Sequence, residues 1–422
     1  MKVALVHDYI KEYGGAERVL EALHEIWPEA PIFTSVYLPE FLGPHRERFN
    51  GWKIKTSILQ SLPLKAKLIS PFRIIAPLIF RSFDFSDYDV VIVSATGAYT
   101  PNMIQLKTTT QSSKITDHTP CAIRHAPVHV CYCHTPPRYL YGFATARDWK
   151  KNIIFRVLGE IANAFLRQID FKSAQNVDYF IANSKNVAGR IKKFYKRDST
   201  VIYPPVVGAE VGHTNFFVPQ LSHEESQGVH QRIGARQDAN RKNLISSPRQ
   251  YFLAGGRLAR PKHIDLIVQA CAELNLPLKI FGKGFAGYDQ QLKNQKSKIK
   301  NITQKSKVEF LGEVSDQEKL ELMKNAKAYI FASEDEDFGI TPVEAMSVGT
   351  PVVAYRSGGV VESVVDGKTG IFFDKLSIES LAEAIRRLSS LGDLSENCRN
   401  QAKKFSKERF KKEIVEFIKS KI

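Results

Sequence analysis

Short apolar runs alternate with helical patterns along the whole chain, and this alternation constrains the fold more than any other feature. Apolar β-branched and aromatic runs joined by helical segments predict buried parallel strands with helical crossovers. In the first half, the predicted strands are residues 3–7, 90–93, 128–133, 179–182 and 201–203. In the second half, they are residues 251–254, 278–281, 308–311, 328–331 and 352–355. We therefore expect an α/β protein with two Rossmann-like, doubly wound parallel sheets.

A polar segment separates the two halves. Residues 208–250 are rich in Gln, Asn, Ser, His and Arg, which is typical of an exposed linker or insertion. The total of 422 residues is long enough for two hydrophobic cores. We expect an N-terminal domain of residues 1–207, a C-terminal domain of residues 251–400, and a final amphipathic helix of residues 401–422 that crosses back to the first domain.

The net charge of +16 and the pI of about 9.4 predict an anionic partner. Because no RNA-binding or zinc-finger spacing is present, phosphorylated small molecules and an anionic membrane surface are favoured over nucleic acid. The five cysteines are scattered, and Met1 leads directly into a strand pattern without a signal peptide, so we expect a cytoplasmic protein. Apolar stretches such as residues 74–80 are too short to cross a bilayer, so membrane contact would be peripheral.

Residues 336–346, with the sequence EDFGITPVEAM, follow a predicted strand and open a helix. Thr341 as N-cap, Pro342 at the first helical position and Glu344 three residues after the cap would form a capping box. A helix N-terminus is also an anion site, and Glu336 and Glu344 would accept hydrogen bonds from sugar hydroxyls there. The two interpretations use different faces of one turn and are compatible.

The seven-residue interval between these two glutamates, followed by AMSVGTPVVA and SGG, resembles the C-terminal signature of glycosyltransferase family 4. Further motifs resemble bacterial O-antigen and capsule mannosyltransferases: VHDY at 6–9, GGAERVL at 14–20, CYCHTPPRY at 131–139, FIANS at 180–184 and YPPV at 203–206. The resemblance implies a retaining enzyme of the GT-B fold. Its two domains would face each other across a cleft, with the acceptor on the N-terminal domain and the nucleotide sugar on the C-terminal domain.

The resemblance also implies roles for residues of the second half. Arg257 and Lys262 match the pair that binds the donor diphosphate, where fixed cations stabilise the charge of the departing group; solvated surface charge is the alternative. Glu344 matches the glutamate that contacts the ribose, and Glu336 the one near the transferred sugar. The backbone N–H groups expected at donor oxygens are those of Phe338, Gly339 and Ile340. We assign no nucleophile, because the leaving phosphate is expected to help deprotonate the acceptor.

In the first half, Gly14 and Gly15 follow the first strand and would let the backbone approach a phosphate, although a plain turn is equally compatible. The pair is not the Gly-x-Gly-x-x-Gly of a dinucleotide-binding turn, which argues against a nicotinamide enzyme. His134 matches the active-site histidine of the family and is suited to contact hydroxyls of the transferred sugar. Outside that context, a histidine here would be an ordinary core residue.

Two further clusters have competing interpretations. The cluster of Cys121, His125, His129, Cys131, Cys133 and His134 suggests zinc. However, Cys131 and Cys133 would face one side of a strand and His134 the other, without a Cys-x-x-Cys pair, so we expect buried thiols instead. Residues 62–85 mix basic and apolar side chains, which indicates either a surface on anionic lipid or a core helix with a basic outer face.

The resemblance thus implies metal-independent, cofactor-free transfer of a hexose, mannose from GDP-mannose, to a lipid-diphosphate-linked glycan of surface polysaccharide synthesis. The enzyme would lie peripherally on the inner face of the cytoplasmic membrane. Two alternatives stay open: a UDP-sugar donor, and a polyanion- or nucleic-acid-binding protein that keeps the fold.

Overall fold

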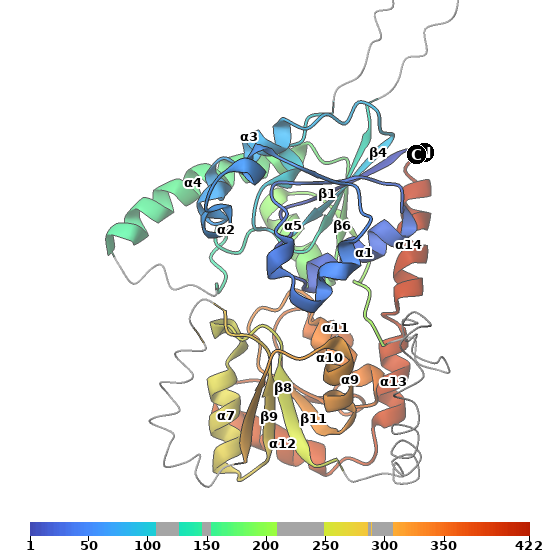
Figure 1. The fold of residues 1–422 in the computed structure, drawn as a ribbon. Helices are drawn as coiled ribbons and strands as arrows, with labels where there is room; N and C mark the ends of the chain where they lie inside the picture. Colours follow the sequence, from blue (N-terminus) through green and yellow to red (C-terminus); the bar gives the residue numbers. More distant parts are fainter. Residues whose placement is uncertain (107–125, 146–152, 209–248, 286–287, 289–306) are drawn as a thin grey trace, which may run out of the picture.

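The computed structural model describes residues 1–106, 126–145, 153–208, 249–285, 288 and 307–422. Most of the predicted linker, residues 209–248, lies outside the described residues, as do Cys121 and His125. Figure 1 shows two α/β domains stacked one above the other, with the C-terminal helices running along one side of both.

The first domain is built on a sheet of seven strands among the described residues, in the order β3-β2-β1-β4-β5-β6-β7, with parallel pairing throughout. The strands are β1 (Val3–His7), β2 (Ile32–Thr34), β3 (Ile54–Thr56), β4 (Val90–Ala95), β5 (Val128–Cys133), β6 (Tyr179–Ala182) and β7 (Ser199–Val201). The sequence prediction missed β2 and β3, and it placed β7 two residues too late. Both missed strands have only three residues, too few to show a periodic pattern.

The second domain is built on a six-stranded parallel sheet in the described part of the chain, in the order β10-β9-β8-β11-β12-β13. The strands are β8 (Tyr251–Gly255), β9 (Leu278–Phe281), β10 (Val308–Gly312), β11 (Ala326–Phe331), β12 (Val352–Tyr355) and β13 (Gly370–Phe373). Only β13 was not predicted. The fold-class prediction of two doubly wound parallel sheets is confirmed.

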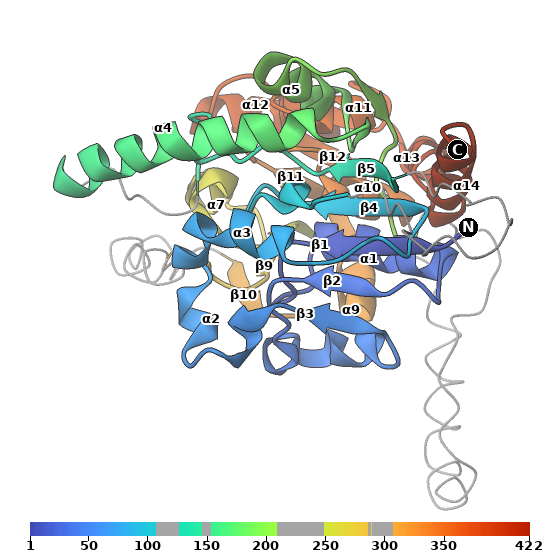
Figure 2. The same ribbon diagram turned by 90° about the horizontal axis from the view of Figure 1, so that it is seen from above.

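Helices cover both faces of each sheet (Figures 1 and 2). In the first domain they are α1 (Gly15–Ile26), α2 (Lys65–Leu68), α3 (Ala76–Arg81), α4 (Ile153–Gln175) and α5 (Lys185–Tyr195). In the second they are α7 (Ile264–Glu273), α9 (Asp316–Lys324), α10 (Ile340–Ser347), α11 (Val360–Ser363) and α12 (Ile378–Ser389). Because each sheet is covered on both sides, alternate residues of one strand enter different cores: Ala4 and Val6 enter one, and Val3 and Leu5 the other.

The predicted C-terminal helix is two helices, α13 (Ser395–Lys403) and α14 (Lys407–Lys419). The chain breaks between them because Ser406 caps α14, accepting a hydrogen bond from the backbone N–H of Arg409. The apolar stripe of α14, Phe410, Ile414 and Ile418, is buried in the core of the first domain. The last helix therefore ties the end of the chain to the domain that contains its beginning.

Candidate active site

Both sheets have the same reversal of strand order, and the predicted site residues lie at these two points. The order reverses between β1 and β4 in the first sheet and between β8 and β11 in the second. In open parallel sheets, ligands bind outside the carboxyl ends of the strands at such a reversal. His7 and Ser94, which pair across β1 and β4, lie there in the first domain. Arg257 and Glu336 follow β8 and β11 in the second.

Lys262 and Glu336 form a close pair in the second domain. Lys262 Nζ lies 2.5 Å from Glu336 Oε2, and Ser333 Oγ donates to the same oxygen at 2.7 Å. Burial alone would raise the pKa of Glu336, but the positive charges of Lys262 and Arg138 lower it to about 2. Glu336 is therefore a fixed anion at neutral pH, next to a fixed cation.

Arg257, the other predicted diphosphate ligand, contacts the opposite domain. Its guanidinium lies 2.6 Å from Glu12 Oε1 and stacks over the ring of Phe285. The sequence interpretation did not foresee that either cation would be paired with a carboxylate. These partners are distant in sequence, so no spacing rule reveals them.

Helix α10 starts at Ile340, two residues earlier than the capping prediction requires. Its N-cap is Gly339, with φ of +88°, and no side chain caps the helix. The predicted capping box is therefore wrong: glycine takes the left-handed conformation, and Thr341 and Pro342 lie inside the helix. The first turn leaves backbone N–H groups that a ligand anion would satisfy.

Glu344 is buried, with 2% of its surface exposed, and does not act as a cap. Its Oε1 lies 2.7 Å from Lys319 Nζ and 3.9 Å from a guanidinium nitrogen of Arg18, which comes from the first domain. Asp316 joins the group by contacting both cations, at 2.6 Å and 3.0 Å. The second glutamate is thus one member of a buried charge network that spans both domains.

Gly14 and Gly15 bring the start of α1 close to the start of α10. A Cβ atom at Gly15 would lie 2.9 Å from Cδ1 of Ile340, so a larger residue would force the neighbour to move. Figure 1 shows α1 directly above α10 and α11. Two helix N-termini, each with a partial positive charge, thus approach one another between the domains.

His134 follows β5 and is buried in the first domain, with 8% of its surface exposed. Its Nε2 lies 2.9 Å from Ser94 Oγ, which lies 3.1 Å from Nδ1 of His7. The pKa of His134 is lowered to about 3, with burial as the main cause. His134 is therefore neutral at physiological pH.

The thiols of Cys131 and Cys133 lie together in the apolar core on one side of β5, as the strand alternation predicts. His129 is also buried and contacts Asn176 O at 3.1 Å and Asn102 Oδ1 at 3.2 Å. Within the described ranges, no group of three or more His, Cys, Asp or Glu residues is arranged to hold a metal ion.

Asp337 joins the domains through residues that were not predicted as functional. Its Oδ1 accepts from Arg190 at 2.6 Å and from Arg138 at 2.9 Å. Arg138 lies within the CYCHTPPRY motif and Asp337 beside Glu336, but the motifs alone do not show that they meet. On the neighbouring element, Glu362 accepts hydrogen bonds from the first two N–H groups of α5, at 2.7 and 2.8 Å.

Several buried polar atoms near the domain interface have no hydrogen-bond partner within the described part of the chain. They include Oδ1 of Asp8, Nη1 of Arg18 and Oε2 of Glu344. A buried polar atom without a partner is costly, and ligand contact is one way to satisfy it. Their position at the two strand-order reversals marks this region as the candidate binding site.

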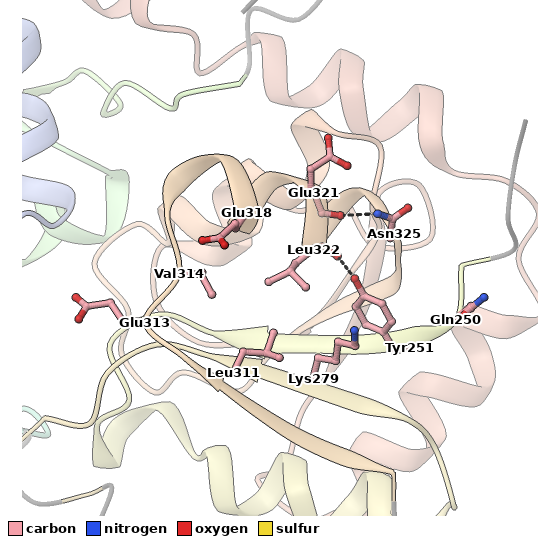
Figure 3. A pocket seen from close by; sticks show the side chains of 10 residues that line it. All are labelled: Gln250, Tyr251, Lys279, Leu311, Glu313, Val314, Glu318, Glu321, Leu322 and Asn325. Carbon is pink, nitrogen blue, oxygen red and sulfur yellow. Dashed lines mark hydrogen bonds between the residues drawn. The ribbon is translucent and has the colours of Figure 1, made fainter. Parts of the chain in front are cut away.

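A separate hollow lies beside α9 on the second domain (Figure 3). It is lined by Gln250, Tyr251, Lys279, Leu311, Glu313, Val314, Glu318, Glu321, Leu322 and Asn325. None of the predicted site residues lines it, and Tyr251 donates from its hydroxyl to Leu322 O across its floor.

The segment of residues 62–85 is neither one helix nor fully packed. It forms α2, a 3-10 turn at Pro71–Ile74 and α3. Phe72 and Phe80 enter the core, whereas Leu64, Ile74 and Leu78 are 63–67% exposed. In the described residues, no helix combines the length and apolar character needed to span a membrane.

Comparison with known proteins identifies the C-terminal half. Residues 235–405 match the profile of the family described as "Glycosyl transferases group 1". The chain is 26% identical over 364 residues to alpha-1,3/1,6-mannosyltransferase ALG2 of Dictyostelium discoideum, covering 81% of this chain and 74% of that protein. It is 31% identical over 137 residues to mannosylfructose-phosphate synthase of Agrobacterium fabrum, covering 31% and 30% of the two chains.

Solved structures share the whole fold at low sequence identity. Anabaena HepE, solved in complex with UDP and glucose, superposes with a TM-score of 0.65 at 17% identity, covering 100% of both chains. Sucrose-phosphate synthase from Thermosynechococcus elongatus gives a TM-score of 0.66 at 16% identity, covering 100% of this chain and 99% of the other. Residues 235–405 therefore form a group 1 glycosyl transferase domain, and the chain has the GT-B fold, as the resemblance in the sequence implied.

Proposed function

We propose that this group 1 glycosyltransferase transfers mannose from GDP-mannose to a hydroxyl of a lipid-diphosphate-linked glycan, with retention of configuration and without a metal ion. Glycosyl transfer follows from the family. The choice of mannose is supported by two relatives whose names state a mannosyl product or activity. An acceptor of surface polysaccharide synthesis is supported by the sequence motifs at residues 131–139 and 203–206.

One observation carries the proposal: two helix N-termini and two cations meet buried, unpartnered polar atoms where both sheets reverse their strand order. A nucleoside diphosphate that leaves the sugar accumulates negative charge. Lys262 and the first turn of α10 would stabilise that charge in the transition state. Glu344, whose Oε2 has no partner among the described residues, would accept a hydrogen bond from a ribose hydroxyl.

The charge state of Glu336 fits a role beside the sugar. The sugar gains positive charge as its bond to the diphosphate breaks, and an ionised carboxylate nearby stabilises that charge. No nucleophile is assigned, since the departing phosphate would take the proton of the attacking hydroxyl. His134, neutral because of its lowered pKa, would hydrogen-bond to the sugar without adding a competing charge.

Peripheral binding to the inner face of the cytoplasmic membrane completes the proposal. It is supported by the exposed apolar side chains of Leu64, Ile74 and Leu78 and by the basic residues interspersed with them. Replacing all three with Gln should reduce sedimentation with anionic vesicles severalfold. Val365→Gln, which changes an exposed apolar residue of the other domain, should leave sedimentation unchanged.

The test of function is a transfer assay with purified protein, a panel of GDP- and UDP-linked sugars, and a labelled glycan acceptor on a lipid diphosphate. We expect transfer from GDP-mannose that persists in EDTA. Transfer from a UDP-sugar alone would show that GDP-mannose is not the donor. A strict requirement for a divalent cation would overturn the metal-independent mechanism. Salt-sensitive oligonucleotide binding without any transfer would favour the polyanion-binding alternative.

A further inference from the structure

A chain of buried polar side chains connects the start of α1 to His134. Glu17 Oε2 accepts from the backbone N–H of Gly14 at 2.8 Å, and its Oε1 lies 3.5 Å from Nε2 of His7. Nδ1 of His7 lies 3.1 Å from Ser94 Oγ, which lies 2.9 Å from Nε2 of His134. His7 and Ser94 have no exposed surface, so water does not compete for these bonds.

The direction of the hydrogen bonds is set at Glu17. Burial raises the pKa of this carboxyl, but hydrogen bonds from His7 and Gly14 hold it below its usual value, so Glu17 is an anion. A carboxylate only accepts, so the nearest nitrogen of His7, Nε2, carries a proton. With a single proton on His7, held at Nε2 by the Glu17 carboxylate, Nδ1 is an acceptor.

The Ser94 hydroxyl has a single proton, so when it donates to His7 it can only accept a hydrogen bond from His134. It donates that proton to Nδ1 of His7 and accepts from Nε2 of His134. His134 is neutral, so a proton on Nε2 leaves Nδ1 with a free lone pair. Among the described residues, the hydrogen bond of the His134 ring is the one between Nε2 and Ser94 Oγ.

We propose that Glu17, His7 and Ser94 are positioning residues that fix His134 as the Nε2–H tautomer, so that its Nδ1 accepts a hydrogen bond from a sugar hydroxyl. This inference rests on the proposed function for the identity of the hydroxyl. Glu17 lies in the GGAERVL motif, whose glycines were expected to approach a phosphate; its own role would be to orient His134. The fixed lone pair selects for a hydroxyl donor at that position of the sugar and against an ether or a deoxy sugar.

The decisive variant is Glu17→Gln, which keeps the shape of the side chain. Its oxygen retains the bond from Gly14, so its amide group faces His7 and donates to Nε2. The whole chain then reverses: His7 donates to Ser94, Ser94 donates to His134, and the proton of His134 moves to Nδ1. Ser94→Ala breaks the chain instead, and Ser173→Ala removes a comparably buried hydroxyl that bonds only to Asp170 O within α4.

Nitrogen-15 spectra of histidine-labelled full-length protein at about pH 8, above the ordinary histidine pKa, show which ring nitrogen carries the proton. We expect Nε2–H for His134 in the unchanged protein and in Ser173→Ala, and Nδ1–H in Glu17→Gln. Glu17→Gln and Ser94→Ala should each lower kcat about 10- to 100-fold, the cost typical of removing a partner that orients a histidine.

An Nδ1–H tautomer or an imidazolium at His134 in the unchanged protein would overturn the inference, as would an unchanged tautomer in Glu17→Gln. The spectra do not depend on turnover, so the two proposals fail separately. If the tautomer is as expected but no sugar is transferred, the proposed function fails alone. If mannose is transferred but the tautomer differs, only the positioning role fails.

Discussion

The two sides of the candidate site differ in the charge of their titratable groups. On the C-terminal side, neighbouring cations lower the pKa of Glu336 to about 2, and the carboxylate stays ionised. On the N-terminal side, burial lowers the pKa of His134 to about 3, so the ring favours its neutral form, and in the core of the same domain burial raises the pKa of Asp170 to about 7. Burial therefore favours the neutral form of a group unless an opposite charge or hydrogen bonds stabilise the charged form. One domain is suited to a charged diphosphate and the other to neutral sugar hydroxyls.

The largest expected effect comes from removing the cation of the charged side. Lys262→Ala should lower kcat about 1,000-fold, or ~4 kcal/mol, because the departing diphosphate loses a positioned positive charge and Glu336 loses its partner. Steady-state transfer kinetics measure this loss. A decrease below about threefold would contradict the role of Lys262.

The matched control is Lys53→Ala. Lys53 pairs with Glu29 at 2.6 Å, nearly the same distance as in the Lys262 pair, but its side chain is 63% exposed. Surface ion pairs contribute little, so we expect unchanged kinetics and stability within about 0.5 kcal/mol.

The effect of burial on a titratable group of the first domain is tested by Asp170→Asn. Asp170 accepts a hydrogen bond from Tyr141 at 2.9 Å in the core of the first domain. Because its folded pKa, about 7, is above its unfolded value, the folded state binds the proton more tightly. The stability this contributes is complete below the unfolded pKa and is lost as pH rises to about 7.

Asn has no proton to lose, so the variant should lack this pH dependence. Its unfolding free energy should exceed that of the unchanged protein by about 4 kcal/mol at pH 8, and by only about 1.5 kcal/mol at pH 5. Denaturant titrations at both pH values measure the difference. A variant that is less stable at pH 8 would show that the carboxylate is ionised and satisfied there.

A smaller effect is expected where the two sides meet. Asp337→Ala removes the acceptor shared by Arg138 and Arg190, and Arg190 is left buried without its charge partner. We expect kcat/KM to fall about tenfold, or about 1.5 kcal/mol, because the two domains must then form the active arrangement without the Asp337 contacts. Unchanged kcat/KM would show that the pair is not needed for the active arrangement.

The sequence predicted the fold well because buried parallel strands leave continuous apolar runs. Ten of the strands were visible in this way, whereas β2 and β3 were too short to leave a pattern. The capping-box prediction failed at Thr341 because a glycine in the left-handed conformation, Gly339, starts the helix two residues earlier. The capping-box rule looks for a Ser or Thr cap and therefore misses a glycine that precedes it.

The site residues named from the sequence lie at the domain interface, but their partners were not predictable. Lys262 meets Glu336 across 74 residues of sequence, and Arg18 meets Asp316 across 298. The first pair depends on how the second domain folds, and the second depends on how the two domains dock. The role of Glu344 changed most, from a helix cap to a buried carboxylate in an interdomain network.

The central claim is that the diphosphate binds on the C-terminal side of the site and the sugar hydroxyls on the N-terminal side. It is tested most directly by GDP binding, measured by isothermal titration calorimetry on the unchanged protein, Lys262→Ala and His134→Ala. The account predicts that Lys262→Ala weakens GDP binding about tenfold or more, since a charged contact is lost. His134→Ala should change GDP binding less than about twofold while still lowering kcat. If His134→Ala weakened GDP binding as much as Lys262→Ala, or if Lys262→Ala bound GDP as tightly as the unchanged protein, the assignment of the diphosphate to the C-terminal side would be contradicted.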